Sequence, residues 1–282
     1  MTRRHIFASL AAAQTGRPGF RMEQITYQSD GLRVRGYVLE PESEGRFPCL
    51  IYNRGGNRSF GSLRRGFVAR ALGPIAASGY VVVASQYRGN MGGEGREEFG
   101  GADVNDVLNL IPLLEKHPKA DATRIGMYGW SRGGMMTYMA LTRTDRIRAA
   151  VIGGGSSDQF LEMLSRPDME RQVMEPLIPN YRANRERELH LRSAVRWPEK
   201  ISKSTPLLLL HGSADWRVQP ESALNMAAAL YRAQHPFRFV FFEGGDHELS
   251  EHRLEVNRLV QEWLDTYVRD GRRWPSLTPH GA

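Results

Sequence analysis

The segment RIGMYGWSRGGMMTYMA, residues 124–140, places one serine between two glycines where an apolar run gives way to a helical pattern. Gly129 and Gly133 stand two positions before and after Ser131, and without a Cβ they leave room for crowded backbone. A strand that turns abruptly into a helix strains its turn residue and lifts the serine hydroxyl to the C-terminal edge of the sheet. The pattern predicts a nucleophilic serine; the alternative is an inert serine in a tight turn.

Short apolar runs alternate with helical patterns along the rest of the chain, which predicts a parallel sheet covered on both faces. The runs 47–53 and 79–87 are dense in apolar residues, as expected for strands buried on both sides. A hairpin is predicted over 23–39 around the turn Asp30–Gly31. Further strands are expected within 124–129, 147–155, 205–212 and 237–245, and helices within 62–78, 103–117, 131–143, 220–234 and 251–270.

Only the segment 156–204 departs from this alternation. It is charged, contains four prolines and has the pattern of short helices, so we expect a small cap over one end of the sheet. The predicted organisation is an N-terminal extension over 1–21, one catalytic α/β domain over 22–270 that includes the cap, and a C-terminal tail over 271–282.

Composition excludes several classes of function. The 282 residues carry a net charge of +7, but the excess is scattered arginine without the basic stripe and interleaved aromatics of a nucleic-acid binder. We interpret it as a solvated surface, with attraction of anionic ligands as a weaker alternative. No run of about 18 apolar residues is present, so no membrane span is expected. The sequence does not indicate an oligomeric state.

The N-terminus and the cysteine content bear on the compartment. The single cysteine, Cys49, lies in a predicted buried strand, and no internal disulfide can form. The first 14 residues, MTRRHIFASLAAAQ, have the order of parts of a secretory signal, but the apolar run has the minimum length. We therefore expect a cytoplasmic protein, with export through a short N-terminal signal as the alternative.

A serine hydroxyl is a poor nucleophile near neutral pH, and it needs a base that an acid orients. In a sheet of this kind the acid and then the base follow the serine in the chain, each after a later strand. Asp215 follows the apolar run in LLLLHGSADWRV, and His247 follows FRFVFFEGG. We predict that Ser131, Asp215 and His247 meet at one edge of the sheet as nucleophile, acid and base.

The neighbouring polar residues have other predicted roles. Asp246 is expected to cap the closing helix, His252 to lie on that helix at the surface, and His211 to shape the loop before Asp215. HELSEH resembles a zinc motif, but His247 and His252 are five positions apart and would point about 140° apart on a helix. They could not share a zinc ion, and we expect neither a metal nor another cofactor.

An oxyanion hole needs N–H donors beside the serine. The backbone N–H of Arg132, at the start of the predicted helix, is one candidate. The loop YNRGGNRSFG, residues 52–61, is expected to supply a second, because Gly55 permits close approach to a substrate. Arg54 could donate through its side chain, or its neighbours through backbone N–H groups; a plain glycine turn is the alternative.

Together the motifs DGLRVRGYVLEP, YNRGGN, SQYRGNMGGEG, GWSRGG, RSAVRWPEK, HGSADWRV and EGGDH resemble the catalytic domain of the prolyl oligopeptidase family, within the α/β-hydrolase superfamily. They run in the family's order from about residue 22 to 265. The resemblance implies an α/β-hydrolase fold, with a mostly parallel central sheet, helices on both faces and the small cap at about 156–204. It implies the same roles for Ser131, Asp215 and His247.

Two departures from the family shape the functional prediction. The family's peptidases carry a β-propeller before the catalytic domain, and about twenty residues precede the first predicted strand here. Arg54 stands where well-known members have tyrosine, which suggests substrates with a carboxylate near the scissile bond. We expect a serine hydrolase that cleaves small esters, short peptides or both through an acyl-enzyme. The alternative is a catalytically silent binding protein of the same fold.

Three aromatic residues are predicted to line the substrate pocket together with the cap. Trp130 precedes the serine and Trp216 follows the predicted acid. Tyr87 lies in QYRG and could equally belong to the core.

Overall fold

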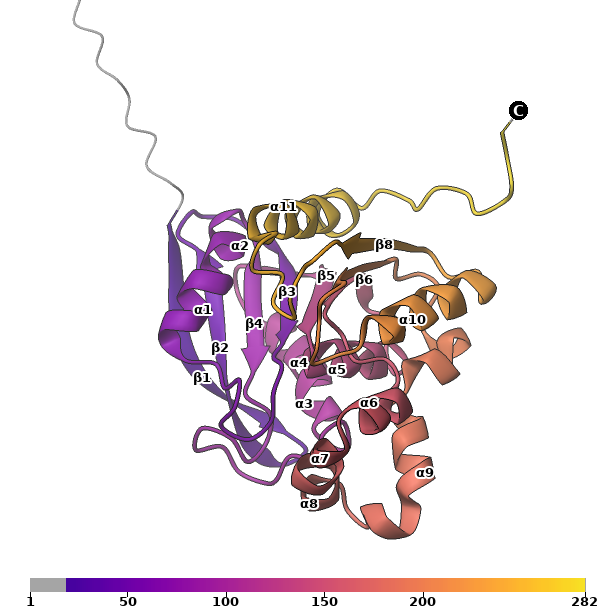
Figure 1. Ribbon diagram of the computed structural model, residues 1–282. Helices are drawn as coiled ribbons and strands as arrows, with labels where there is room; N and C mark the ends of the chain where they lie inside the picture. The colour runs from indigo at the N-terminus through magenta and orange to yellow at the C-terminus, as the bar shows by residue number, and fades with distance from the viewer. Residues whose placement is uncertain (1–18, 282) are drawn as a thin grey trace, which may run out of the picture.

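The computed structural model describes residues 19–281 and is built around one eight-stranded sheet (Figure 1). The strand order is β1-β2-β4-β3-β5-β6-β7-β8. β2 pairs antiparallel with β1 and with β4, and every other neighbouring pair is parallel. The strands are β1 (Phe20–Ser29), β2 (Leu32–Pro41), β3 (Phe47–Asn53), β4 (Val81–Ser85), β5 (Ala120–Trp130), β6 (Ile147–Gly153), β7 (Leu207–Gly212) and β8 (Phe237–Phe242).

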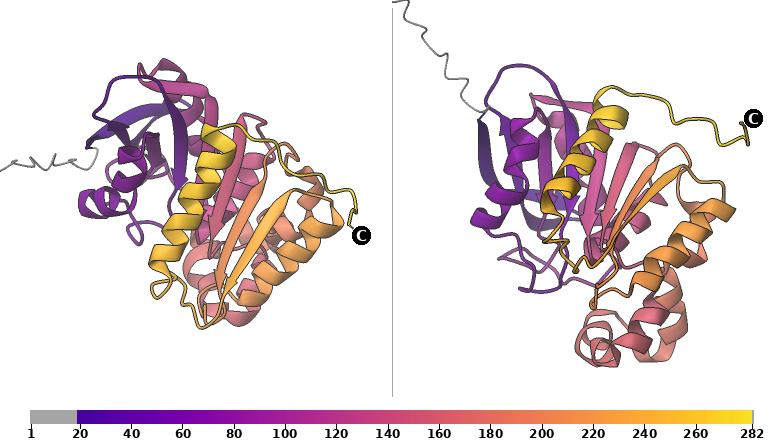
Figure 2. Two further views of the ribbon diagram at one scale, coloured as in Figure 1. Left: turned by 90° about the horizontal axis from the view of Figure 1, so that it is seen from above. Right: turned by 45° about the horizontal axis from the view of Figure 1, so that its top comes forward.

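Helices cover both faces of this sheet, as the views in Figures 1 and 2 show. The helices α3 (Val104–Leu108), α4 (Leu110–Lys116), α5 (Arg132–Leu141) and α10 (Pro220–Arg232) pack on one face. The helices α1 (Arg65–Ala71), α2 (Gly73–Ala77) and α11 (Arg253–Leu264) pack on the other, and α11 runs into a π-helical turn, Asp265–Arg269.

The central strands are buried on both sides because their residues alternate between two apolar layers. Ile51 of β3 belongs to the layer under α5, whereas its neighbour Leu50 belongs to the layer under α11. Val82 of β4 faces the α11 side, and the valines on either side of it face the other layer. Successive side chains of a strand point to opposite faces, so these strands need apolar residues at every position.

The predicted hairpin is present. Ser29 of β1 pairs with Leu32 of β2, and the two residues between them, Asp30 and Gly31, have φ values of 52° and 79°. Positive φ at both central residues matches the right-handed twist of the strands, and aspartate and glycine adopt it readily.

The segment after β6 forms the predicted cap. Its helices lie together beyond the end of the sheet where β6 finishes (Figures 1 and 2). Asp158 begins the cap by accepting the backbone N–H groups of Phe160 and Leu161. The elements are α6 (Gln159–Ser165), α7 (Pro167–Met169), a π-helical turn (Glu170–Met174), α8 (Glu175–Leu177), α9 (Tyr181–Leu191) and 3₁₀ turns at Ala194–Arg196 and Pro198–Lys200.

Every strand and helix expected from the sequence is confirmed, but two predicted helices are divided. The pattern over 62–78 forms α1 and α2, with Pro74 in the first turn of α2, and the pattern over 103–117 breaks at Asn109. Residues 271–281 carry no helix or strand, although Trp274 packs on the ring of Trp263. In the part of the chain that the structure describes, no helix combines the length and apolarity needed to span a bilayer. The predicted export signal lies outside the described residues.

The packing of α5 on β3 generates a stability prediction. A Cβ on Gly133 would collide with the backbone oxygen of Asn53. We expect Gly133→Ala to lower the free energy of unfolding by about 3 kcal/mol, because backbone on both sides must move. Gly66→Ala is the matched control, because a Cβ at this position would meet only the Arg70 side chain, at 3.8 Å. This substitution should stabilise helix α1 by about 0.5–1 kcal/mol. Urea denaturation measures the free energy of unfolding of both variants. Equal values for Gly133→Ala and Gly66→Ala would contradict the close packing of α5 on β3.

Candidate active site

Ser131 occupies the sharp turn between β5 and α5. Its φ of 58° and ψ of −124° are strained for a residue with a side chain. A Cβ on Gly129 would collide with the backbone of Gly133, and one on Gly133 would collide with the backbone of Asn53. The two glycines flanking the serine are therefore needed because three stretches of backbone meet here.

A buried carboxylate and an imidazole lie at the ends of the last two strands. Asp215 follows β7 and His247 follows β8, and His247 Nδ1 lies 2.8 Å from Asp215 Oδ2. Asp215 Oδ1 accepts the backbone N–H groups of Arg217 and Val218 at 2.8 and 3.0 Å. Burial alone would raise the pKa of Asp215, but the hydrogen bonds from the histidines and the backbone hold it well below its usual value.

A second histidine contacts the same carboxylate. His211, at the end of β7, is almost completely buried; its Nε2 lies 3.0 Å from Val218 O and 3.3 Å from Asp215 Oδ2. The predicted role of His211 in shaping this loop is confirmed. Its contact with Asp215 was not predicted, because the sequence does not show how the loop folds back on the strand.

Several contacts hold His247 against the strand ends next to Ser131. The backbone N–H of Ser131 donates to Gly153 O at 2.9 Å. A Cβ on the next residue, Gly154, would lie 3.4 Å from the His247 ring, and Trp130 Nε1 donates to His247 O at 3.0 Å. The ring of His247 therefore lies at the end of β6, beside the turn that carries Ser131.

The loop after β3 approaches Ser131 closely. A Cβ on Gly55 would lie 3.2 Å from Ser131 Cβ and 3.8 Å from its Oγ, so any larger residue would crowd the hydroxyl. Within residues 19–281 the backbone N–H groups of Gly55 and Arg132 have no acceptor in the chain. Both are thus free to donate to a group bound at Ser131.

The Arg54 side chain is fully committed to holding this loop. A guanidinium has five N–H donors, and all five hydrogen bonds of Arg54 go to backbone oxygens, at 3.0–3.3 Å. The acceptors are those of Gly55, Arg58, Phe60 and Gln86. The guanidinium of Arg54 has no donor left for a ligand. The structure therefore overturns two suggestions, that this side chain donates to an oxyanion and that it pairs with a substrate carboxylate.

Tyr87 belongs to the core rather than to a pocket wall. It has no exposed surface, and its hydroxyl donates to Arg54 O at 3.0 Å. The guanidinium carbons of Arg54 and Arg132 lie 5.1 and 4.9 Å from its ring centroid. Burial, and then the positive charge of Arg132, lower the pKa of Arg54 to about 10.

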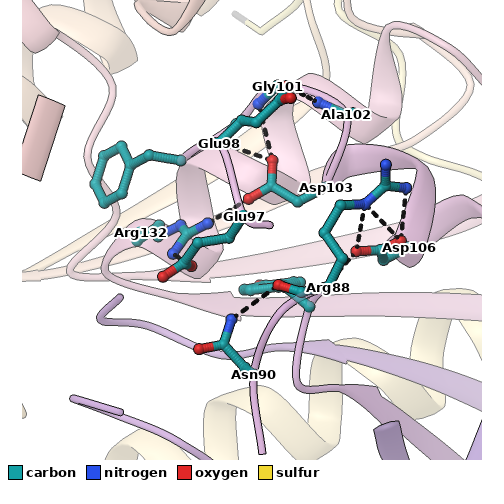
Figure 3. A network of polar contacts seen from close by, with 12 residues as sticks. Arg88, Asn90, Glu97, Glu98, Gly101, Ala102, Asp103, Asp106 and Arg132 are labelled. Atoms are coloured by element: carbon teal, nitrogen blue, oxygen red, sulfur yellow. Dashed lines mark hydrogen bonds and ion pairs between the residues drawn. The ribbon is translucent and has the colours of Figure 1, made fainter. Parts of the chain in front are cut away.

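Two buried carboxylates hold the side chain of Arg132 (Figure 3). Arg132 Nη1 lies 2.5 Å from Glu97 Oε2 and donates to Gly56 O at 2.9 Å, while Nη2 pairs with Asp103. Burial disfavours the charge, but the two carboxylates outweigh it and raise the pKa of Arg132. Sequence analysis missed Glu97 and Asp103; the only signal was an arginine placed beside the serine, where burial would require acidic partners.

The sequence matches a known protein family over most of its length. The profile of the prolyl oligopeptidase family matches residues 68–271. The peptidase YtmA of Bacillus subtilis, described as uncharacterized, is 33% identical over 86% of this chain and 93% of its own length. The chain belongs to the prolyl oligopeptidase family. It has the α/β-hydrolase fold and is a serine hydrolase, as its resemblance to the family implied.

Solved structures agree on the fold. The acylaminoacyl peptidase of Pyrococcus horikoshii superimposes with a TM-score of 0.77 at 22% identity, over 92% of this chain and 44% of that protein. A puromycin-hydrolyzing peptidase of Mycobacterium tuberculosis gives a TM-score of 0.68 at 26% identity, over 87% of this chain and 39% of that protein. This prolyl oligopeptidase family member thus spans less than half the length of either enzyme.

The two tryptophans predicted for the pocket differ in exposure. Trp130 is half-buried beneath the His247 loop, whereas 63% of the Trp216 surface is exposed beside Asp215. The guanidinium carbons of Arg166 and Arg217 lie 5.7 and 5.1 Å from the Trp216 ring centroid. Trp216 therefore presents an aromatic surface near Asp215, flanked by cationic groups from the cap and from its own loop.

Two predictions about the His247 loop need correction. Asp246 accepts the backbone N–H groups of Glu248 and Ser250, so it stabilises the turn that carries His247 and does not cap α11. His252 lies just before α11, and its Nε2 lies 3.1 Å from Glu243 O. The helix begins two residues later than its sequence pattern, so His252 stands at its start and not within it. Within residues 19–281 no three His, Cys, Asp or Glu side chains gather in a metal-binding arrangement.

Glu162 of α6 is a buried carboxyl that sequence analysis missed. It is 1% exposed, has no ion pair within residues 19–281, and accepts one long hydrogen bond, 3.4 Å, from the Ser156 hydroxyl. The backbone N–H of Ser156 donates to Ser131 O, so the carboxyl lies close to the turn that carries Ser131. Burial, opposed by Arg166 and reinforced by Asp215, raises the pKa of Glu162 to about 8. In the sequence it resembled an ordinary solvated position on a charged helix.

The raised pKa of Glu162 predicts how stability changes with pH. The folded state retains this proton up to about pH 8, whereas the unfolded carboxyl loses it near 4.5. Stability should therefore fall between these values as pH rises, by about 1.4 kcal/mol per pH unit from this group. We expect Glu162→Gln to remove that slope and to be the more stable protein at pH 8.

Urea denaturation of wild type and Glu162→Gln at pH 5, 6.5 and 8 measures the difference between their slopes. Glu255→Gln, on the exposed face of α11, is the matched control and should follow wild type. Parallel pH profiles for wild type and Glu162→Gln would contradict a carboxyl buried in this way.

Proposed function

We propose that this chain hydrolyses carboxylic esters and short peptide bonds with Ser131 as nucleophile, His247 as base and Asp215 as orienting acid. The 2.8 Å contact between His247 Nδ1 and Asp215 Oδ2 carries the proposal, because it lies at the strand ends beside a strained, glycine-flanked serine. This is the spatial order that activation of a serine hydroxyl requires.

The first half of the reaction forms an acyl-enzyme. Asp215 accepts a hydrogen bond from the protonated Nδ1 of His247. This leaves the unprotonated Nε2 to take the proton of the Ser131 hydroxyl. Ser131 Oγ attacks the carbonyl carbon, and the negative oxygen of the tetrahedral intermediate accepts the N–H groups of Arg132 and Gly55. His247 then gives its proton to the departing alcohol or amine as the bond to it breaks.

The second half repeats these steps with water. His247 takes a proton from the water as the water oxygen attacks the acyl carbon, and the resulting tetrahedral intermediate uses the same two N–H donors. The bond from this carbon to Ser131 Oγ then breaks, the acid product leaves, and Ser131 Oγ takes the proton back from His247. The lowered pKa of Asp215 supports this scheme, because it keeps the acid ionised through the neutral range. A charged Asp215 stabilises the imidazolium that forms in both halves.

The proposed substrates are small acyl compounds of the amino-acid type. The exposed Trp216 offers a flat apolar surface beside the site, and aromatic rings bind apolar side chains well. An acylaminoacyl peptidase of the same fold was solved in complex with Z-Gly-Gly-Phe-chloromethyl ketone, and the mycobacterial relative is named for puromycin hydrolysis. Both names support testing blocked and free aminoacyl compounds here, even though this chain spans less than half of each relative.

Activity measurements test this function directly. Wild type and Ser131→Ala should be compared on p-nitrophenyl esters and on blocked and free aminoacyl p-nitroanilides. We expect turnover that Ser131→Ala abolishes, and a fall of roughly 10⁴-fold in kcat for Asp215→Asn, as when a triad loses its orienting acid. The ratio of ester to anilide turnover decides between esterase and peptidase. Ser204→Ala, on an exposed serine, should match wild type.

A fluorophosphonate separates the remaining outcomes. Stoichiometric labelling of Ser131 without turnover of any substrate would mean that the nucleophile works and the natural substrate differs from the panel. Neither labelling nor turnover would instead favour a binding protein of the same fold.

A further inference from the structure

The guanidinium of Arg132 connects segments of the chain that lie beside the turn carrying Ser131. It extends from the first residue of α5 and donates to Gly56 O in the loop after β3. It forms ion pairs with Glu97 in the loop after β4 and with Asp103 at the start of α3. The residue whose backbone N–H lies beside Ser131 is thus fixed through its own side chain.

The two carboxylates are themselves tied to backbone. The second oxygen of Glu97 accepts the N–H of Arg58, so this one carboxylate holds both Arg132 and the loop that contains Gly55. Asp103 Oδ1 accepts the N–H groups of Gly100 and Gly101 at 3.0 and 2.8 Å. Movement of Arg132 would therefore disturb hydrogen bonds on both sides of Ser131.

Aromatic rings restrict the same guanidinium. Its central carbon lies 4.9 Å from the Tyr87 ring centroid and 4.6 Å from that of Phe99. Arg132, Glu97 and Asp103 are each at most 4% exposed. The network thus has little freedom to rearrange and little contact with solvent.

Stability alone does not account for three buried charges. Removing charged groups from water is costly, and buried ion pairs contribute little net stability compared with apolar residues of similar volume. What such a network does provide is fixed geometry, because a planar guanidinium with two carboxylates has one favourable arrangement. Fixed geometry matters here, because an oxyanion donor is effective only when its nitrogen lies about 2.7–3.1 Å from the oxygen that develops the negative charge.

We propose that the Arg132 side chain, held by Glu97 and Asp103, is a positioning group that sets the separation between the N–H donors of Arg132 and Gly55. This inference rests on the proposed function, because it assigns those two N–H groups to the oxyanion hole. The network makes no contact with the reacting atoms; it acts on the transition state by fixing the backbone that does.

Helix α3 supplies a matched pair of variants. Asp103→Asn breaks the pair with Arg132. Asp106→Asn breaks a second buried pair, one turn further along, in which Asp106 Oδ1 lies 2.8 Å from Arg88 Nη2 (Figure 3). Both variants replace a fully buried carboxylate that binds an arginine, so both should lose thermal stability. Only the first should alter the oxyanion donors.

Steady-state kinetics on the best ester of the panel distinguish the two roles. We expect Asp103→Asn and the isosteric Glu97→Gln to lower kcat about 10- to 100-fold with KM within about twofold, because misplaced donors weaken the transition state and not substrate binding. Their affinity for a boronate that forms a tetrahedral adduct with Ser131 should fall by the same factor. Asp106→Asn should keep kcat and boronate affinity within about twofold of wild type.

Fluorophosphonate labelling, continued until it is complete, gives the concentration of folded active sites in each variant. The maximal rate divided by this concentration is the kcat that is compared. The inference is overturned if Glu97→Gln and Asp103→Asn retain wild-type kcat and boronate affinity, or if Asp106→Asn loses as much as they do. Failure of the proposed function would be recognised separately, because wild type itself would then show no turnover that depends on Ser131.

Discussion

The close approach of α5 to the ends of β3 and β5 is the constraint on which the rest of the site depends. Gly129 and Gly133 permit it, because a Cβ at either position would collide with backbone. The approach forces Ser131 into its strained conformation and leaves the N–H of Arg132 without a partner in the described chain. It also brings the loop with Gly55 into contact with the serine, where we propose that the N–H of Gly55 serves as the second oxyanion donor.

Buried arginines maintain this arrangement. Arg54 uses all its donors on backbone oxygens, and Arg132 uses most of its donors on carboxylates and a backbone oxygen. The two guanidinium groups flank Tyr87. Where well-known members of the family place a tyrosine in the loop, this chain uses an arginine to hold the loop itself, so its donor to the oxyanion is expected to be backbone N–H.

Most of the fold followed from local pattern. Strands such as β4 were predicted because both of their faces are apolar, and α5 because small residues surround a serine at a strand end. The start of the closing helix was predicted two residues too early: α11 begins at Arg253, and Asp246 belongs to a separate turn before it. The cap was predicted as short helices, but which of its side chains are buried was not, and Glu162 was missed for that reason.

The sequence by itself determined the fold class, the chain order of Ser131, Asp215 and His247, and their placement after strands, because periodicity and strand ends are local properties. Only the tertiary structure decided which polar groups meet. It brought Glu97 and Asp103 to Arg132 and committed Arg54 to the loop. Those contacts join residues distant in the chain, and the electrostatic cost of burial, which selects the partners of a charge, depends on the packed structure.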